Sequence, residues 1–253
     1  MTRDRSPHLL GSLLVLLASA GAQDPTALVF REFSSVQRLR VVCSQQHFGR
    51  IDDLVAEVPS GRLVAAVVTM HDEPQSRMVS VPFAELRYEP GANLLQLANC
   101  ASKDGAYATF DPAAVKVAPQ VPPTGGAAEP KGIVLVSRLQ HGLVQLKDGG
   151  PGSAQGLWIE LTGGHVAFLD LANGRERAGD ADLHPVPWAA LRFVDDGLGA
   201  GGAPKAAAPT LALAKTAAEL AAAPNLIQII VADPLYRAKL YAVFGVRPVF
   251  ERS

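Results

Sequence analysis

The sequence has almost no net charge, few cysteines and only one long apolar run, and these shortages limit what the protein can be. Its 23 basic and 24 acidic residues give a formal charge of −1. A charge this small produces no field that would gather nucleic acid or an anionic membrane. Two cysteines allow a single intrachain bridge. Hydrophobic residues still make up 48% of the chain, against 19% charged, so a packed core is expected.

The one long apolar run lies at the N-terminus. Arg3 and Arg5 precede the stretch Leu9 to Leu17, which is short for a membrane span, and Ala-Gly-Ala at 20–22 offers a cleavage site. This pattern predicts a signal peptide over residues 1–22 and an exported product, periplasmic or secreted; an uncleaved anchor is the alternative. No later segment is apolar for long enough to cross a bilayer, so we expect no integral membrane protein once the leader is removed.

If the chain is exported, its two cysteines could form a disulfide bond. Cys43 ends the first apolar strand, and Cys100 follows the strand at 94–98. In an oxidising compartment, a bridge between them would close a small domain. Two buried thiols that never meet are an equal alternative, because the sequence does not supply the Cα separation that a bridge requires.

The chain contains an internal repeat. The segment 48–88 runs strand, glycine turn, apolar strand, loop and a strand that ends in Val-Pro-Phe, and the same plan returns about a hundred residues later, ending in Val-Pro-Trp. Gly61 is 21 residues before Pro82, and Gly164 is 23 residues before Pro187. We therefore predict domains at 33–117 and 131–214, joined by a Pro/Gly/Ala linker at 118–130, with a flexible insertion at 198–209.

Local signals add detail to this plan. The apolar alternation changes phase at Asp52-Asp53, which predicts a bulge. Gly163-Gly164 predicts a hairpin with a two-residue turn. In the tail, 215–253, Thr216 and Glu219 are spaced as a capping box. Asp233-Pro234 is placed to start a helix that Gly245 ends, and this helix is expected to cover one face of the second domain.

Three motifs then carry a resemblance. Gly49-Arg50-Ile51-Asp52-Asp53-Leu54, the turn Ser60-Gly61-Arg62-Leu63 and the Val-Pro-Phe/Trp-Ala-x-Leu endings resemble the PRC-barrel family. The second copy lacks the Ile-Asp-Asp segment but keeps the hairpin and His-Pro-Val-Pro-Trp at 184–188.

The resemblance implies a mainly β fold: two small antiparallel PRC-type β-barrels in tandem, with a short C-terminal helical tail. It also implies contact with other macromolecules or regulation of an assembly, without catalysis. The residues that carry it as structural motifs are Gly49, Asp52, Asp53, Gly61, Pro82, Phe83, Gly164, Pro187 and Trp188. Phe83 and Trp188 occupy equivalent motif positions, which favours core packing over ligand stacking.

The sequence offers no clear reactive constellation. Asp52-Asp53 suggests a metal or acid–base pair, but no further ligands are spaced to join it, so a polar bulge at a solvent edge is the preferred interpretation. The histidines after the leader show no ligand spacing, and no nucleophile elbow or phosphate loop is present. They are His47, His71, His141, His165 and His184. We therefore predict no enzyme, no catalytic residue, no cofactor and no metal.

Three functions are consistent with these features to different degrees. The first is an exported, non-enzymatic module that binds a protein or another envelope component. The second is a small-molecule or metal-binding regulator that uses a cleft between the barrels, with His184 and Asp52 as candidate ligands. The third, an RNA-associated factor, is disfavoured by the leader and the near-neutral charge, so no nucleic-acid partner is expected.

Overall fold

The computed structural model describes residues 27–44, 46–70, 76–100, 107–115, 117–118, 131–174, 183–195, 210–225 and 231–248. The predicted leader and insertion, most of the linker, and His71 lie outside these residues.

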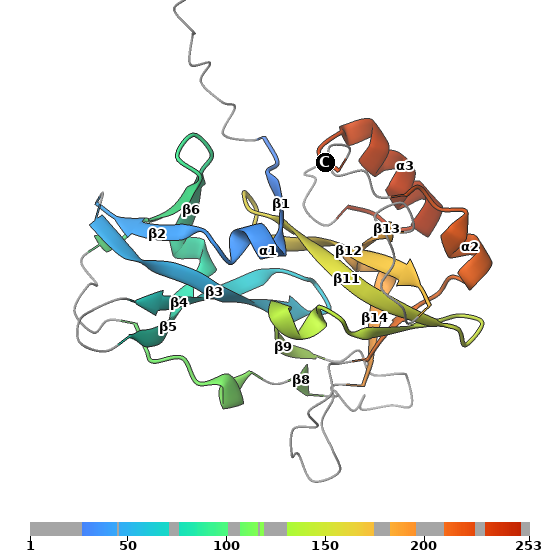
Figure 1. Cartoon of the computed structure of the whole chain (residues 1–253), viewed down its shortest axis with the longest axis horizontal. Coiled ribbons are helices and arrows are strands. Elements are labelled where there is room, and N and C mark those ends of the chain that lie inside the picture. The colour runs from blue at the N-terminus through green and yellow to red at the C-terminus, as the bar shows by residue number, and fades with distance from the viewer. Residues whose placement is uncertain are drawn as a thin grey trace, which may run out of the picture.

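The described chain is mainly β and forms two curled sheets side by side, with a short C-terminal helix against the second (Figure 1). Each sheet bends into a half-barrel. This confirms the predicted fold class. Each sheet also contains one parallel pair, β2 with β7 and β10 with β15, in an otherwise antiparallel order.

The first repeat contributes the following elements. They are β1 (Phe30–Glu32), α1 (Phe33–Val36), β2 (Arg40–Cys43), β3 (Gln46–Val58), β4 (Leu63–Met70), β5 (Arg77–Pro82), the 3₁₀ turn η1 (Phe83–Glu85), β6 (Leu86–Glu89), β7 (Leu94–Leu97), η3 (Pro112–Ala114) and β8 (Val117–Ala118).

The second repeat and the tail contribute the rest. They are β9 (Lys131–Leu135), η4 (Val136–Leu139), β10 (Leu143–Leu146), β11 (Pro151–Glu160), β12 (His165–Asn173), β13 (Leu183–Pro187), η6 (Trp188–Ala190), β14 (Leu191–Asp195), β15 (Thr210–Leu213), α2 (Ala217–Ala221) and α3 (Pro234–Phe244).

The two sheets have the same strand order. It is β5-β4-β3-β2-β7-β6 in the first and β13-β12-β11-β10-β15-β14 in the second. Their irregularities also match: the β3–β4 ladder shifts register between Ile51 and Asp53, and the β11–β12 ladder shifts between Ala154 and Gly156, positions that are 103 apart. The bulge predicted at Asp52-Asp53 is thus confirmed, and it recurs at the matching place in the second copy.

The opening strands are exchanged between the repeats. β1 pairs with β11 of the second sheet, and β9 pairs with β3 of the first. In matching register, Glu32 lies opposite Trp158, and Leu135 lies opposite Val55. Each sheet therefore includes a strand from the other copy, and the chain passes from one sheet to the other after β1 and again after β9.

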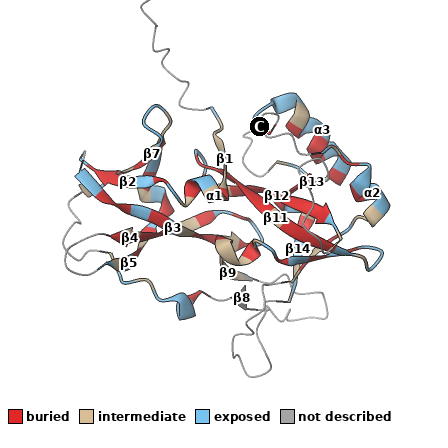
Figure 2. Ribbon diagram, in the orientation of Figure 1, coloured by how far each residue is buried: buried red, intermediate tan, exposed pale blue. Residues whose placement is uncertain are grey.

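The buried apolar side chains form one continuous cluster that spans both sheets. Figure 2 shows buried residues along the strands of both sheets. Phe33 of α1 and Trp188 of η6 belong to the same cluster, and both are almost fully buried. β3 and β4 each contain three consecutive buried residues, at 54–56 and 66–68, so both faces of these strands are covered there. The two repeats share a single core.

The tail follows its sequence signals. Thr216 and Glu219 form the predicted capping box at α2, and the Asp233 side chain accepts from Leu235 N at the start of α3. Gly245, at φ 66°, ends α3. The helix packs on β13 and places Tyr241 against Phe168 of β12, ring centroids 5.8 Å apart. No helix among the described residues is long and apolar enough to cross a membrane.

One local prediction is wrong. Glu160 lies opposite His165 in the β11–β12 ladder, so the connection is the four residues 161–164 rather than a two-residue turn at Gly163-Gly164. The reason is the Glu160 carboxylate, which accepts from Thr162 N at 2.7 Å and Gly163 N at 2.6 Å and stabilises the longer loop.

Candidate functional site

The motif glycines and aromatics meet across the two repeats. A Cβ added to Gly61 would come within 2.5 Å of the Trp188 ring, and one added to Gly164 would come within 2.7 Å of the Phe83 ring. Both glycines have positive φ, 73° and 71°. Each turn therefore requires glycine for two reasons: its backbone has a positive φ, and an aromatic ring occupies the space that a Cβ would fill. Phe83 and Trp188 pack, as expected, but each packs on the turn of the other copy.

Backbone hydrogen bonds join the same two turns reciprocally. Leu63 N donates to Gly164 O at 2.7 Å, and Val166 N donates to Gly61 O at 2.8 Å. Between them, Arg62 and His165 form an isolated antiparallel bridge. Trp188 Nε1 also donates to Pro59 O at 2.7 Å. The motif residues of the two copies thus form one approximately two-fold contact.

Asp53 ties the bulge of β3 to the second repeat. Its carboxylate accepts from Leu54 N at 2.8 Å, from Ser137 N at 3.0 Å and from the Ser137 hydroxyl, so it holds the first turn of η4. Burial raises the pKa of Asp53, against the lowering effect of these hydrogen bonds. Asp52 is exposed and accepts from Thr69 Oγ1 at 3.0 Å. The two carboxylates therefore have separate structural neighbours.

His165 lies at the centre of the contact between the turns. Burial lowers its pKa, and the Arg62 guanidinium lowers it further, while Glu160 and the Gly163 backbone act in the opposite direction. Glu160 itself is fully buried and holds the 161–164 loop. This pair of polar residues could not be predicted from a motif, because neither His165 nor Glu160 belongs to one; only the constant spacing of the repeat could have indicated it.

The polar residues under the tail also have local partners. His184, 5% exposed, places Nδ1 3.2 Å from Ala223 O. Arg237 is buried and donates to Val231 O and Ala232 O. Burial raises the pKa of Tyr236 to about 12, with the charge of Asp170 adding to the effect. His184 and Asp52, the ligands considered for a cleft between the barrels, lie in different sheets, each with its own partner.

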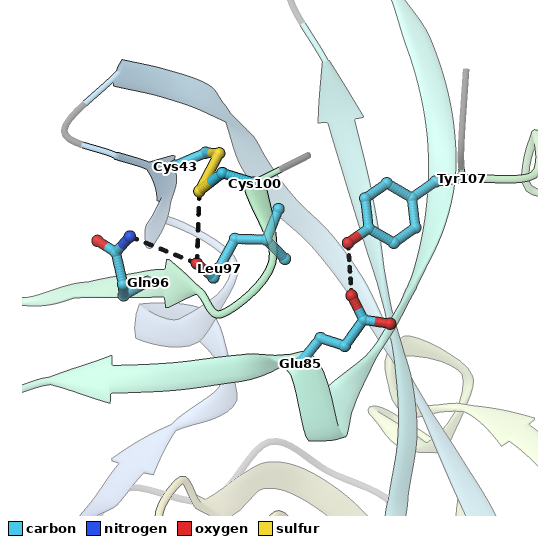
Figure 3. The surroundings of a disulfide bond; sticks show 6 residues. All are labelled: Cys43, Glu85, Gln96, Leu97, Cys100 and Tyr107. Carbon is cyan, nitrogen blue, oxygen red and sulfur yellow. Dashed lines mark hydrogen bonds between the residues drawn. A yellow bond between two sulfur atoms is a disulfide. The ribbon is translucent and has the colours of Figure 1, made fainter. Parts of the chain in front are cut away.

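The structure joins Cys43 to Cys100, with Cα atoms 5.4 Å apart (Figure 3). The bridge links the end of β2 to the chain just after β7, its parallel neighbour. Closing a loop of 57 residues restricts the unfolded chain by about 4 kcal/mol on the loop-entropy estimate. Nearby, Tyr107 donates to Glu85 at 2.6 Å (Figure 3).

A groove of about 850 Å³ opens at one end of the contact between the repeats. It is lined by residues 27–29 before β1, by residues 86–91 of β6 and its turn, and by residues 161–162 of the second hairpin. Neither His184 nor Asp52 is among these lining residues. Beneath it, Tyr88 is held by Arg31, 2.9 Å from its hydroxyl, and donates to Asn93 at 2.8 Å. The groove was not predicted from the sequence, because it depends on the exchanged position of β1.

The described residues contain no group of three or more His, Cys, Asp or Glu side chains placed to hold a metal ion. No protein-family model and no curated protein matches this chain. The fold and the site therefore define a structural class: a mainly β protein of two half-barrel sheets, built from an internal repeat and joined by exchanged strands.

Proposed function

We propose that this protein is an exported, non-enzymatic protein of the PRC-barrel type that binds a protein component of the cell envelope. The observation that carries the proposal is the use of the motif residues. Gly61, Phe83, Gly164 and Trp188 all serve the contact between the repeats. The contact joins the two repeats through these residues, and the groove at its end offers a partner a concave surface built from both repeats.

Two features support export. The N-terminal sequence has the three parts of a signal peptide. Cys43 and Cys100 are bridged, and disulfides persist mainly in oxidising compartments outside the cytosol. Neither feature depends on the other. The proposed location is the periplasm or the extracellular medium.

Photo-crosslinking in intact cells tests the proposal. A photoreactive amino acid replaces Arg87, whose exposed side chain pairs with Glu89 at the groove lip. The matched control places it at Arg192, the exposed counterpart on β14. We expect one discrete crosslinked envelope protein from position 87 of the exported chain and none from position 192. A protein retained in the cytosol, or no adduct at position 87, would contradict the proposal.

A further inference from the structure

The groove lies between two sheet edges. Among the described strands, β6 pairs only with β7, and β1 pairs only with β11. The lining residues 86–89 are β6 itself, and residues 27–29 lead directly into β1. Both walls of the groove are therefore extended backbone.

The hydrogen-bonding pattern shows which backbone groups face the groove. Ala98 N donates to Glu85 O at 2.8 Å, so alternate residues of β6 face β7 and the groups of Leu86 and Tyr88 face the other way. Likewise, Leu161 N donates to Val29 O at 2.8 Å, which leaves the groups of Leu28 facing away from β11. Each wall presents main-chain donors and acceptors outward.

The internal repeat shows what such an edge binds. At the repeat spacing of 103 residues, Lys131 at the start of β9 is the counterpart of Leu28. At Lys131 the outer edge of β9 is paired with another strand. Ala118 of β8 lies opposite Lys131, and Val117 lies opposite Gly132, in an antiparallel ladder. The chain thus adds a strand of its own, β8, to β9, and twelve residues, 119–130, separate the two strands in the sequence.

The predicted cleavage would leave much less chain upstream of the first repeat. Cleavage at the predicted site leaves four residues, Gln23 to Thr26, before Ala27. These four residues cannot supply both a connection as long as residues 119–130 and a two-residue strand like β8. The second wall of the groove, β6, also differs from its counterpart in the second repeat, β14. The β14–β15 ladder has a register shift between Phe193 and Asp195, whereas the β6–β7 ladder is regular.

We propose that the groove binds an extended peptide segment of a partner protein, which adds as an antiparallel strand to the edge at Leu28 beside β6. The inference rests on the proposed function and specifies how the partner is recognised. Main-chain hydrogen bonds supply the affinity, as in other cases of strand addition. Arg87 and Glu89 pair at 3.4 Å on the lip, so both signs of charge are present and a segment of low net charge fits.

A fluorescent peptide with the sequence of residues 113–119, AAVKVAP, is the probe, because it contains the strand that fills the counterpart edge. The full chain is expressed with its leader and recovered after export, its N-terminus is determined by mass, and binding is followed by anisotropy. We expect saturable binding. Leu28→Pro, which removes the outward N–H, weakens it at least about tenfold, while Leu28→Ala, which keeps that N–H, stays within about twofold.

Two controls make the result decisive. Lys131→Pro makes the same change at the counterpart edge and leaves binding unchanged. A peptide with proline in place of its second valine loses binding to the wild-type chain, which keeps the test valid if Leu28→Pro fails to fold.

Absence of saturable binding, equal binding by a folded Leu28→Pro variant, or equal binding by the proline peptide would overturn the inference. Loss of peptide binding in Lys131→Pro but not in Leu28→Pro would also overturn it, because the peptide would then be replacing β8 on β9. If the crosslink from position 87 persists in Leu28→Pro, the proposed function stands while this mode of recognition fails.

Discussion

At the scale of single residues, the polar groups of this protein hold the repeats together. Asp53 fixes the first turn of η4 in the other copy, and Glu160 holds the loop that carries Gly164. Both are partly or fully buried carboxylates that accept backbone N–H groups. Burial of such a group is tolerated because its hydrogen bonds are satisfied.

Asp53→Ala is expected to lower the free energy of unfolding by about 1–3 kcal/mol, because Ser137 N would lose its acceptor. Asp53→Asn keeps a carbonyl acceptor and should cost less. Asp52→Ala, at the exposed neighbour, should change stability by less than about 0.5 kcal/mol. Urea titrations of the three variants measure the differences; equal losses at positions 52 and 53 would refute the role given to Asp53.

His165 is expected to make the fold weaker in mild acid. Its folded-state pKa is lowered, chiefly by burial, so the unfolded chain binds the proton more readily than the folded one. The stability contribution is therefore present above the unfolded pKa of about 6.5 and is lost as the pH falls below it towards the folded value.

The measurement is the free energy of unfolding between pH 7.5 and 5.5. His165→Asn should show a shallower fall than the wild type, and His141→Asn, at an exposed histidine, should keep the wild-type slope. Identical slopes for the wild type and His165→Asn would contradict this account.

At the scale of elements, the two hairpin turns connect the repeats to each other. Each turn combines a positive φ, a backbone hydrogen bond to the opposite copy and an aromatic ring at contact distance. A substitution that shifts one turn is therefore expected to weaken contacts in both sheets.

Gly164→Ala tests this connection. An alanine in the left-handed region lowers the free energy of unfolding by about 1–2 kcal/mol through its backbone conformation alone. Its Cβ would also lie 2.7 Å from Phe83 and must displace that ring, which costs about 1–3 kcal/mol more. Gly149→Ala is the matched control, because Gly149 has φ 80° and nothing within 4 Å of an added Cβ. Thermal unfolding should show the larger loss for Gly164→Ala; equal losses would remove the steric part of the argument.

The elements also show what the sequence could and could not predict. The bulge at Asp52, the capping box at Thr216 and the helix from Pro234 to Phe244 were predictable, because each depends on residues close together in the chain. The exchange of β1 and β9 was not, since a three-residue strand has no usable period and its partner is about 130 residues away.

The groove and the polar contact at His165 were missed for the same reason. Both exist only where the two copies meet, so no local pattern indicates them. The aromatic residues at 83 and 188 were correctly assigned to packing, but the sequence did not show that each rests on the other copy's turn.

At the scale of the whole molecule, the two repeats form one body. They exchange strands, share a single apolar cluster and hold each other's turns. Neither sheet keeps its full set of strands without the other copy. The groove, with walls from both repeats, exists only in this joined state.

The most direct test is equilibrium unfolding in urea followed in both repeats at once. Both tryptophans, Trp158 and Trp188, belong to the second repeat, so their fluorescence reports on it. Pulsed hydrogen exchange of β3 and β4 reports on the first. Because the two repeats share one core, we expect a single transition with the same midpoint for both probes. Loss of protection in β3 and β4 at a urea concentration where tryptophan fluorescence is still native would show two independent domains and contradict it.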